Sequence, residues 1–142
     1  MECYNLCFYS SLVFLFNIVV AYYYEYYVYS ILFFLLMMTS LYHHSHYTLC
    51  TRIIDKIAVY LVVFYGGYLF YNKINKKSDK INTKTYVLFL TIITTFLSTI
   101  LLYYYGYVTN SLCYCDDNSV ANYFHSFMHC IGSLGHACIV IL

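Results

Sequence analysis

Three histidines are the residues of this sequence best suited to chemistry. His125 and His129 are four positions apart, a spacing that places both imidazoles on one face of a helix. His44 lies far earlier in the chain, so another helix must bring it to them. Three imidazoles from two helices can hold zinc and leave a fourth position open. The sequence therefore predicts a Zn²⁺ site with His44, His125 and His129 as the metal ligands.

Two further polar residues accompany His44 and suit hydrolysis. Ser40 precedes His44 by one helical turn, so its hydroxyl could donate a hydrogen bond to an oxyanion at a substrate carbonyl. Asp55 could act as general base, because zinc lowers the pKa of a water molecule to roughly 7. We therefore predict that Asp55 and Ser40 are catalytic in cleaving an amide or an ester.

Simpler interpretations exist for the same residues. His125 and His129 could be packing residues that hydrogen-bond to neighbouring groups. Asp55 could pair with Arg52 or Lys56 nearby in the sequence. These alternatives stay open at the level of sequence.

The other histidines are interpreted as ordinary polar residues. His43 and His46 fit an interfacial position. His136 follows His129 by seven residues, which is about 10 Å along a helix and too far to share one metal ion. We expect His136 to be a buried, hydrogen-bonded group.

The cysteines do not form the framework of a small secreted protein. Cys113 and Cys115 could bind a metal or form a disulfide with Cys50, but no second ligand pair follows at zinc-finger spacing, so we interpret this segment as a loop. Cys130 and Cys138 lie within an apolar run and are expected to be packing residues.

The composition is that of a membrane protein. Of the 142 residues, 63% are hydrophobic and only 9% are charged, and the mean hydropathy is +0.67. Soluble domains average about 25% charged residues, so membrane-spanning helices are the expected class. The net charge of +1 provides no basic surface for nucleic acid.

The apolar runs predict an all-α, polytopic transmembrane helix bundle of about five spans, forming a single domain over residues 1–142. The N-terminal run lacks the features of a cleaved signal peptide and is counted as a span. Gly66-Gly67 is expected to be a weak point or a close helix contact. The expected spans are Leu6–Tyr24, Tyr26–Tyr42, Ile53–Tyr71, Tyr86–Tyr107 and Val120–Leu142.

Orientation follows from the segment Asn72–Lys84, which carries five basic residues and one Asp. The positive-inside rule places it in the cytoplasm, so the N-terminus and the loop Val108–Ser119 are lumenal or outside. Arg52 and Lys56 fall on the lumenal side, against the rule. The five candidate site residues then share one membrane depth near the lumenal face, where a polar cluster is costly and indicates function.

The pattern of these residues resembles the CREST superfamily of membrane hydrolases. Ser-x3-His at Ser40 and His44, an Asp at Asp55 and a terminal HxxxH at His125 and His129 follow the family's order. The superfamily includes alkaline ceramidases, progestin/adiponectin receptor and hemolysin-III-like proteins, and myomaker-like proteins. The resemblance implies zinc held by the three histidines, with Asp acting on water and Ser assisting, and lipid amide hydrolysis in the ceramidase branch. That family has seven spans, two more than expected here.

Two classes of function follow. The first is a zinc-dependent hydrolase of a lipid amide such as ceramide. The second is a non-enzymatic membrane protein, receptor-like or acting in membrane remodelling or fusion, that keeps a structural metal site. Membrane lipids are the expected partners in an integral, multi-pass protein of the endoplasmic reticulum or another endomembrane. With five spans instead of seven, the helices enclose the site less completely. The site is then either open to lipid and water or closed by a second copy of the chain in a homo-oligomer.

Overall fold

The computed structural model describes residues 4–76 and 82–142, and these residues form helices without any strand. This confirms the predicted all-α fold. The centre of the segment Asn72–Lys84, residues 77–81, lies outside the described residues. The helices are α1 (Tyr4–Ser11), α2 (Phe14–Tyr23), α3 (Tyr27–His46), α4 (Leu49–Lys76), α5 (Thr83–Ile100), a π-helical segment η1 (Leu101–Tyr105), α6 (Gly106–Thr109), a 3₁₀ turn η2 (Leu112–Tyr114) and α7 (Asn118–Ile141).

Among the described residues, four helical segments are long and apolar enough to cross a membrane. They fit an integral, multi-pass membrane protein. The second expected span, Tyr26–Tyr42, corresponds to α3, which has 20 residues and the length of a crossing but is not among these four. The four segments are Leu6–Tyr23, Leu49–Lys76, Thr83–Thr109 and Asn118–Ile141.

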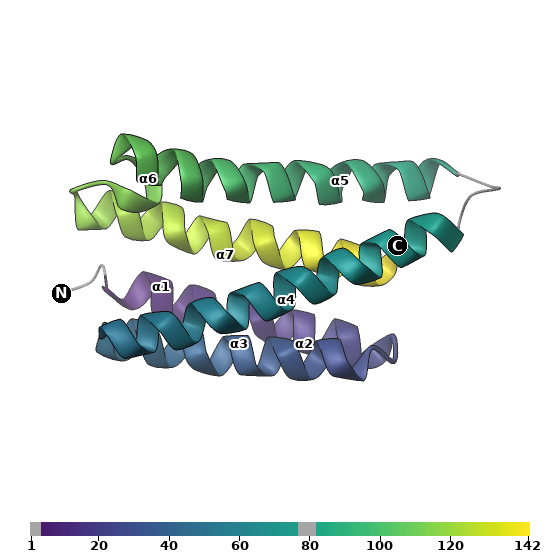
Figure 1. Ribbon diagram of the computed structural model, residues 1–142, viewed down its shortest axis with the longest axis horizontal. Helices are drawn as coiled ribbons and strands as arrows, with labels where there is room; N and C mark the ends of the chain where they lie inside the picture. The colour runs from purple at the N-terminus through teal and green to yellow at the C-terminus, as the bar shows by residue number, and fades with distance from the viewer. Residues whose placement is uncertain (1–3, 77–81) are drawn as a thin grey trace.

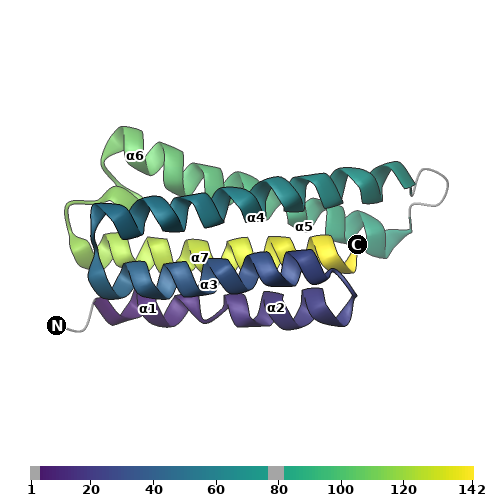
Figure 2. The same cartoon turned by 60° about the horizontal axis from the view of Figure 1, so that its bottom comes forward.

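The helices run alternately up and down, and α7 occupies the centre of the bundle (Figures 1 and 2). The central helix packs against α1, α2 and α5 and touches α4, whereas α3 packs against α1, α2 and α4. Glu25, at φ 65°, lies in the turn between α2 and α3, where the sequence predicts a turn. The end of α3 and the start of α7 therefore lie at the same end of the bundle.

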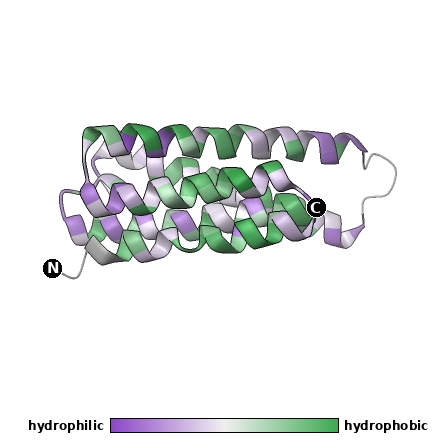
Figure 3. Cartoon of the chain, turned by 90° about the horizontal axis from the view of Figure 1, so that it is seen from below, coloured by the Kyte–Doolittle hydropathy of each residue, from purple (hydrophilic) through white to green (hydrophobic). Residues whose placement is uncertain are grey.

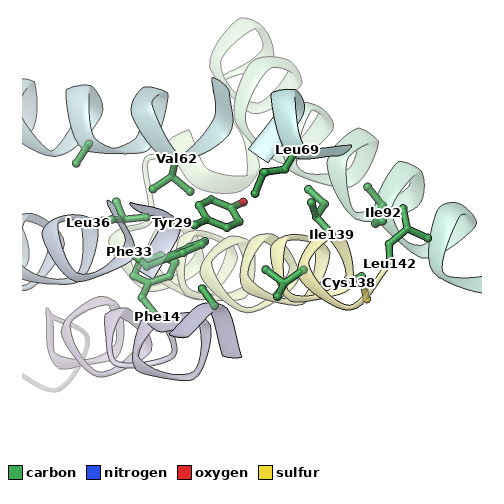
Figure 4. Packing of buried hydrophobic residues seen from close by; sticks show 13 residues of the cluster. Phe14, Tyr29, Phe33, Leu36, Val62, Leu69, Ile92, Cys138, Ile139 and Leu142 are labelled. Atoms are coloured by element: carbon green, nitrogen blue, oxygen red, sulfur yellow. The ribbon is translucent and has the colours of Figure 1, made fainter. Parts of the chain in front are cut away.

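Aromatic side chains form the middle of the core (Figure 4). Tyr29 and Phe33 are fully buried with ring centroids 4.8 Å apart, and Phe14 lies 6.3 Å from Phe33. Large apolar side chains also cover the outside of the helices, and hydrophilic residues concentrate toward the ends of α4 (Figure 3). Such an apolar exterior suits a lipid environment.

The first span is broken between α1 and α2. The hydroxyls of Ser10 and Ser11 both donate to the carbonyl of Cys7, at 3.0 and 2.8 Å. Serine hydroxyls that bond back to the preceding turn compete with helical hydrogen bonds and bend helices. Leu12 and Val13 continue the chain with tighter, three-residue hydrogen bonds. The break places both serines at the depth of the three histidines.

One of the two adjacent glycines of α4 marks a close helix contact, which was one of the two roles expected for this pair. A Cβ atom on Gly66 would lie 2.9 Å from Nδ1 of His136 and would also meet the hydroxyl of Tyr29. A Cβ atom on Gly67 would meet nothing within 4 Å. Gly66 thus lets α4 approach α3 and α7 around the bonded pair Tyr29 and His136.

Two glycines of α7, Gly132 and Gly135, allow the packing of this helix to be tested. Gly135→Ala should destabilise the bundle by about 1–3 kcal/mol, because the added methyl group overlaps the hydroxyl of Thr95 on α5. Gly132→Ala is the matched control: its methyl group meets nothing within 4 Å, so stability should stay level or rise by up to about 1 kcal/mol. Unfolding of the detergent-purified variants by heat would compare them, and equal midpoints would contradict the packing of α5 on α7.

Candidate metal centre

The three predicted metal ligands converge between α3 and α7. One ring nitrogen from each of His44, His125 and His129 lies within 4.8 Å of the other two. Ring centroids are 5.1 Å apart for His44 and His125, 5.5 Å for His44 and His129, and 4.8 Å for His125 and His129. The i,i+4 spacing on α7 accounts for the pair, and the last turn of α3 supplies His44. This group could hold a metal ion.

His44, which belongs to this group, has a buried ring nitrogen without a hydrogen bond. Its side chain is 6% exposed, and Nδ1 lies 3.3 Å from the hydroxyl of Tyr47. Nε2 is the sole fully buried side-chain nitrogen or oxygen in the described part of the chain that lacks a hydrogen bond. A buried polar atom without a partner costs about 1–3 kcal/mol, and a metal ion bound to Nε2 would remove that cost.

Hydrogen bonding also prepares His129 as a ligand. Its Nδ1 lies 2.8 Å from the hydroxyl oxygen of Ser10, whose proton goes to the carbonyl of Cys7. With the Ser10 proton so used, Nδ1–H of His129 donates to Ser10 and the lone pair of Nε2 remains available. Metal-bound histidines commonly donate their other N–H in this way. The ring of Phe14, 5.3 Å away, covers one side of His129.

Ser40 lies on the same face of α3 as His44, as predicted, but it has a protein partner. It is 1% exposed, and its hydroxyl oxygen is 2.9 Å from that of Ser11. Because Ser11 donates to Cys7, the proton of Ser40 is directed at Ser11. Ser40 would have to release Ser11 before it could donate to an oxyanion.

Asp55 lies on α4, and its partner is on α3. The hydroxyl of Thr39 donates to Oδ1 of Asp55 at 3.3 Å, and the carboxylate is not part of the histidine group. Within residues 4–76 and 82–142, Asp55 makes no ion pair with Arg52 or Lys56, so that simpler interpretation is wrong. Thr39 and Ser40 are consecutive residues of α3 and lie on different faces of that helix. Asp55 therefore lies beside the face of Thr39 and not beside the face that carries Ser40 and His44. A catalytic role for Asp55 stays a prediction.

The remaining histidines are hydrogen-bonded elsewhere, which confirms the prediction for His136. Nδ1 of His43 lies 3.0 Å from the hydroxyl of Thr51, and Nδ1 of His46 lies 3.2 Å from the carbonyl of Tyr42. His136 is bonded through Nδ1 to the hydroxyl of Tyr29. None of them belongs to the group of three.

The loop cysteines form no second metal group in the described residues, and Cys50, Cys113 and Cys115 are thiols. Burial, followed by the neighbouring Cys7, raises the pKa of the Cys113 thiol to about 11, which makes it a poor nucleophile and ligand at neutral pH. Cys138 is a core residue as predicted, whereas Cys130 faces outward.

The role of Ser10 can be measured through metal affinity. We expect Ser10→Ala to weaken metal binding about 10- to 100-fold, because Nδ1–H of His129 loses its acceptor. Ser45→Ala is the matched control: Ser45 is exposed, and its hydroxyl bonds only within α3, to the carbonyl of Leu41. Competition with a chromogenic chelator would give both dissociation constants. An unchanged affinity in Ser10→Ala would show that Ser10 does not orient the ligand.

The fold and this group define an all-α membrane protein with a candidate metal centre of three histidines. No family model matches the chain, no curated protein is significantly similar to it, and no solved structure is significantly similar to it. The resemblance to the CREST superfamily therefore stays a prediction.

Proposed function

We propose that the protein is a zinc-dependent membrane hydrolase of a lipid amide, similar in chemistry to the ceramidases of the CREST superfamily. One observation carries the proposal: Nε2 of His44 is buried without a hydrogen bond beside two further imidazoles. A buried polar atom without a hydrogen bond is unfavourable unless an ion or another partner satisfies it. Three neutral imidazoles are the ligand set of many catalytic zinc sites.

A zinc ion bound there would polarise a carbonyl group and lower the pKa of a water molecule. Residues of the chain would orient the ligands, accept a proton and bind the oxyanion. Ser10 orients the imidazole of His129, and the ring of Phe14 packs against that imidazole. Asp55 would accept a proton and Ser40, once released from Ser11, would donate a hydrogen bond to the developing oxyanion.

The position of the centre favours a lipid substrate. It lies near one end of a bundle whose exterior is apolar, so a substrate carbonyl at the membrane interface can reach it while an acyl chain stays among the helices. The proposed setting is the lumenal face of the endoplasmic reticulum or of another endomembrane. Five helices would enclose an acyl chain only in part, and a second copy of the chain would complete the enclosure.

A second candidate is a non-enzymatic membrane protein with a structural metal site. The complete burial of Ser40 and its bond to Ser11 favour this alternative, because both are what a packing serine needs. A structural site requires the three histidines and makes no use of Asp55.

The test combines metal content with turnover. Detergent-purified protein should hold about one zinc ion per chain by elemental analysis and release fatty acid from long-chain ceramide or a related lipid amide. Stoichiometric zinc without release of fatty acid from a panel of lipid amides and esters would favour the non-enzymatic candidate. Absence of zinc from protein purified without chelators would reject both candidates.

A further inference from the structure

Two basic residues lie one helical turn apart near the start of α4, at the end of the bundle that holds the histidines. Arg52 is exposed and Lys56 is half-buried. Their i,i+4 spacing places them on one face of the helix. Neither makes an ion pair with an acidic residue within the described residues. Two positive charges at a membrane interface therefore stay without a negative partner from the chain itself.

Their location makes this pair costly without an anion. Arg52 lies in the first turn of α4, which contains no acidic residue, and the partial positive charge of a helix N-terminus repels a cation there. Lys73 and Lys76 lie in the last turn of α4, at its opposite end, so the positive-inside rule disfavours basic residues at this end. An anion bound from outside the chain would offset the unfavourable placement of these two cations.

Two tyrosines lie beside the cationic pair and add hydroxyl groups to it. The ammonium group of Lys56 lies 5.6 Å from the ring centroid of Tyr103, and the rings of Tyr103 and Tyr114 are 5.4 Å apart. Tyr103 belongs to the π-helical segment η1, and such segments often occur at functional sites. Burial, followed by Tyr103, raises the pKa of Tyr114 while the charge of Arg52 opposes the rise, so this phenol keeps its proton at neutral pH.

We propose that Arg52, Lys56 and the hydroxyls of Tyr103 and Tyr114 bind the phosphate group of an anionic phospholipid. A phosphate oxygen accepts strong hydrogen bonds from guanidinium, ammonium and phenol groups, and the fork of an arginine matches it especially well. Ile53 and Ile57 follow the two cations in the sequence and are about half-exposed, which provides an apolar surface for the acyl chains. That apolar surface is the reason to choose a lipid over a soluble phosphate.

This site is independent of the proposed hydrolase. It uses none of the histidines of the metal group and none of the residues assigned a part in hydrolysis. Its occupancy therefore depends neither on bound zinc nor on turnover.

The experiment measures binding of a fluorescent phosphatidic acid to the detergent-purified chain, with a phosphatidylcholine of the same acyl chains as the reference. Arg52→Gln with Lys56→Gln should raise the dissociation constant for phosphatidic acid about 30-fold, equivalent to about 1 kcal/mol for each basic residue near an anionic lipid. Binding of phosphatidylcholine should stay unchanged. Tyr103→Phe keeps both charges and the ring and should raise the constant about fivefold through loss of one hydrogen bond.

A charge-matched control separates a built site from general attraction. Lys76→Gln with Lys84→Gln removes the same charge from exposed positions at the other end of the bundle. An equal loss in this control, or no loss in Arg52→Gln with Lys56→Gln while helicity is retained, would overturn the proposal. Inorganic phosphate is the competitor that identifies the source: displacement of the lipid by an equal concentration of inorganic phosphate would overturn the assignment to a lipid.

Discussion

Replacing His129 by alanine should empty the metal centre. His129 supplies one of the three converging nitrogens, and its loss leaves only His44 and His125 to hold the ion. Because the ligands come from two helices, metal binding energy is also folding energy. With metal at about a thousand times its dissociation constant, the stabilisation lost is about 4 kcal/mol. Elemental analysis should therefore show stoichiometric metal in the original chain and almost none in His129→Ala.

The stability measurement distinguishes metal loss from the cavity that the missing ring creates. A chelator should lower the unfolding midpoint of the original chain and leave that of His129→Ala unchanged. His43→Ala is the control: this neighbouring imidazole bonds to Thr51, outside the group, so metal should remain and the chelator should still act. Equal metal content in both variants would refute the assignment of the centre.

Asp55→Asn should abolish most turnover while leaving zinc and fold in place, if the proposed hydrolase is correct. The amide oxygen can still accept the hydrogen bond from Thr39, but it cannot take a proton. A general base is typically worth about 10²–10⁴ in rate, so turnover on long-chain ceramide-like amides should fall within that range. Release of fatty acid in saturating substrate, together with zinc analysis, measures both quantities.

Thr39→Val is the matched variant for this experiment. It removes the hydroxyl that bonds to Asp55 and keeps the carboxylate and the shape of the side chain. We expect at most about a tenfold loss, since a positioning contact is worth less than the base itself. Turnover that survives Asp55→Asn unchanged would reject the mechanism even where hydrolysis itself is observed.

Periodicity allowed the ligands to be predicted from sequence. His125 and His129 share a helix face wherever a helix forms, and Ser40 and His44 do the same on α3. Alternation of spans then places the end of α3 beside the start of α7, which is confirmed. These relations depend only on helix geometry and on the number of crossings between them.

The surroundings of the centre depend on helix rotation and crossing, which sequence does not determine. Ser10 and Ser11 were missed because a serine pair in an apolar span indicates a bend but not the direction of its hydroxyls. Asp55 was expected beside the histidines, yet its partner is Thr39, because the angle between α3 and α4 sets its position. α4 also begins at Leu49, a turn before the expected start at Ile53.

The place of α7 in the chain has a consequence for biogenesis. Two of the three candidate ligands, His125 and His129, lie in α7, which is synthesised after the helices that carry His44 and Ser10. Chains are synthesised from the N-terminus, at about 5–20 residues per second. During that time the earlier helices contain His44 without the other two imidazoles. Metal can therefore be bound by all three histidines only after α7 has been synthesised. A chain that stops anywhere before residue 118 would therefore insert as a helical membrane protein without a metal centre.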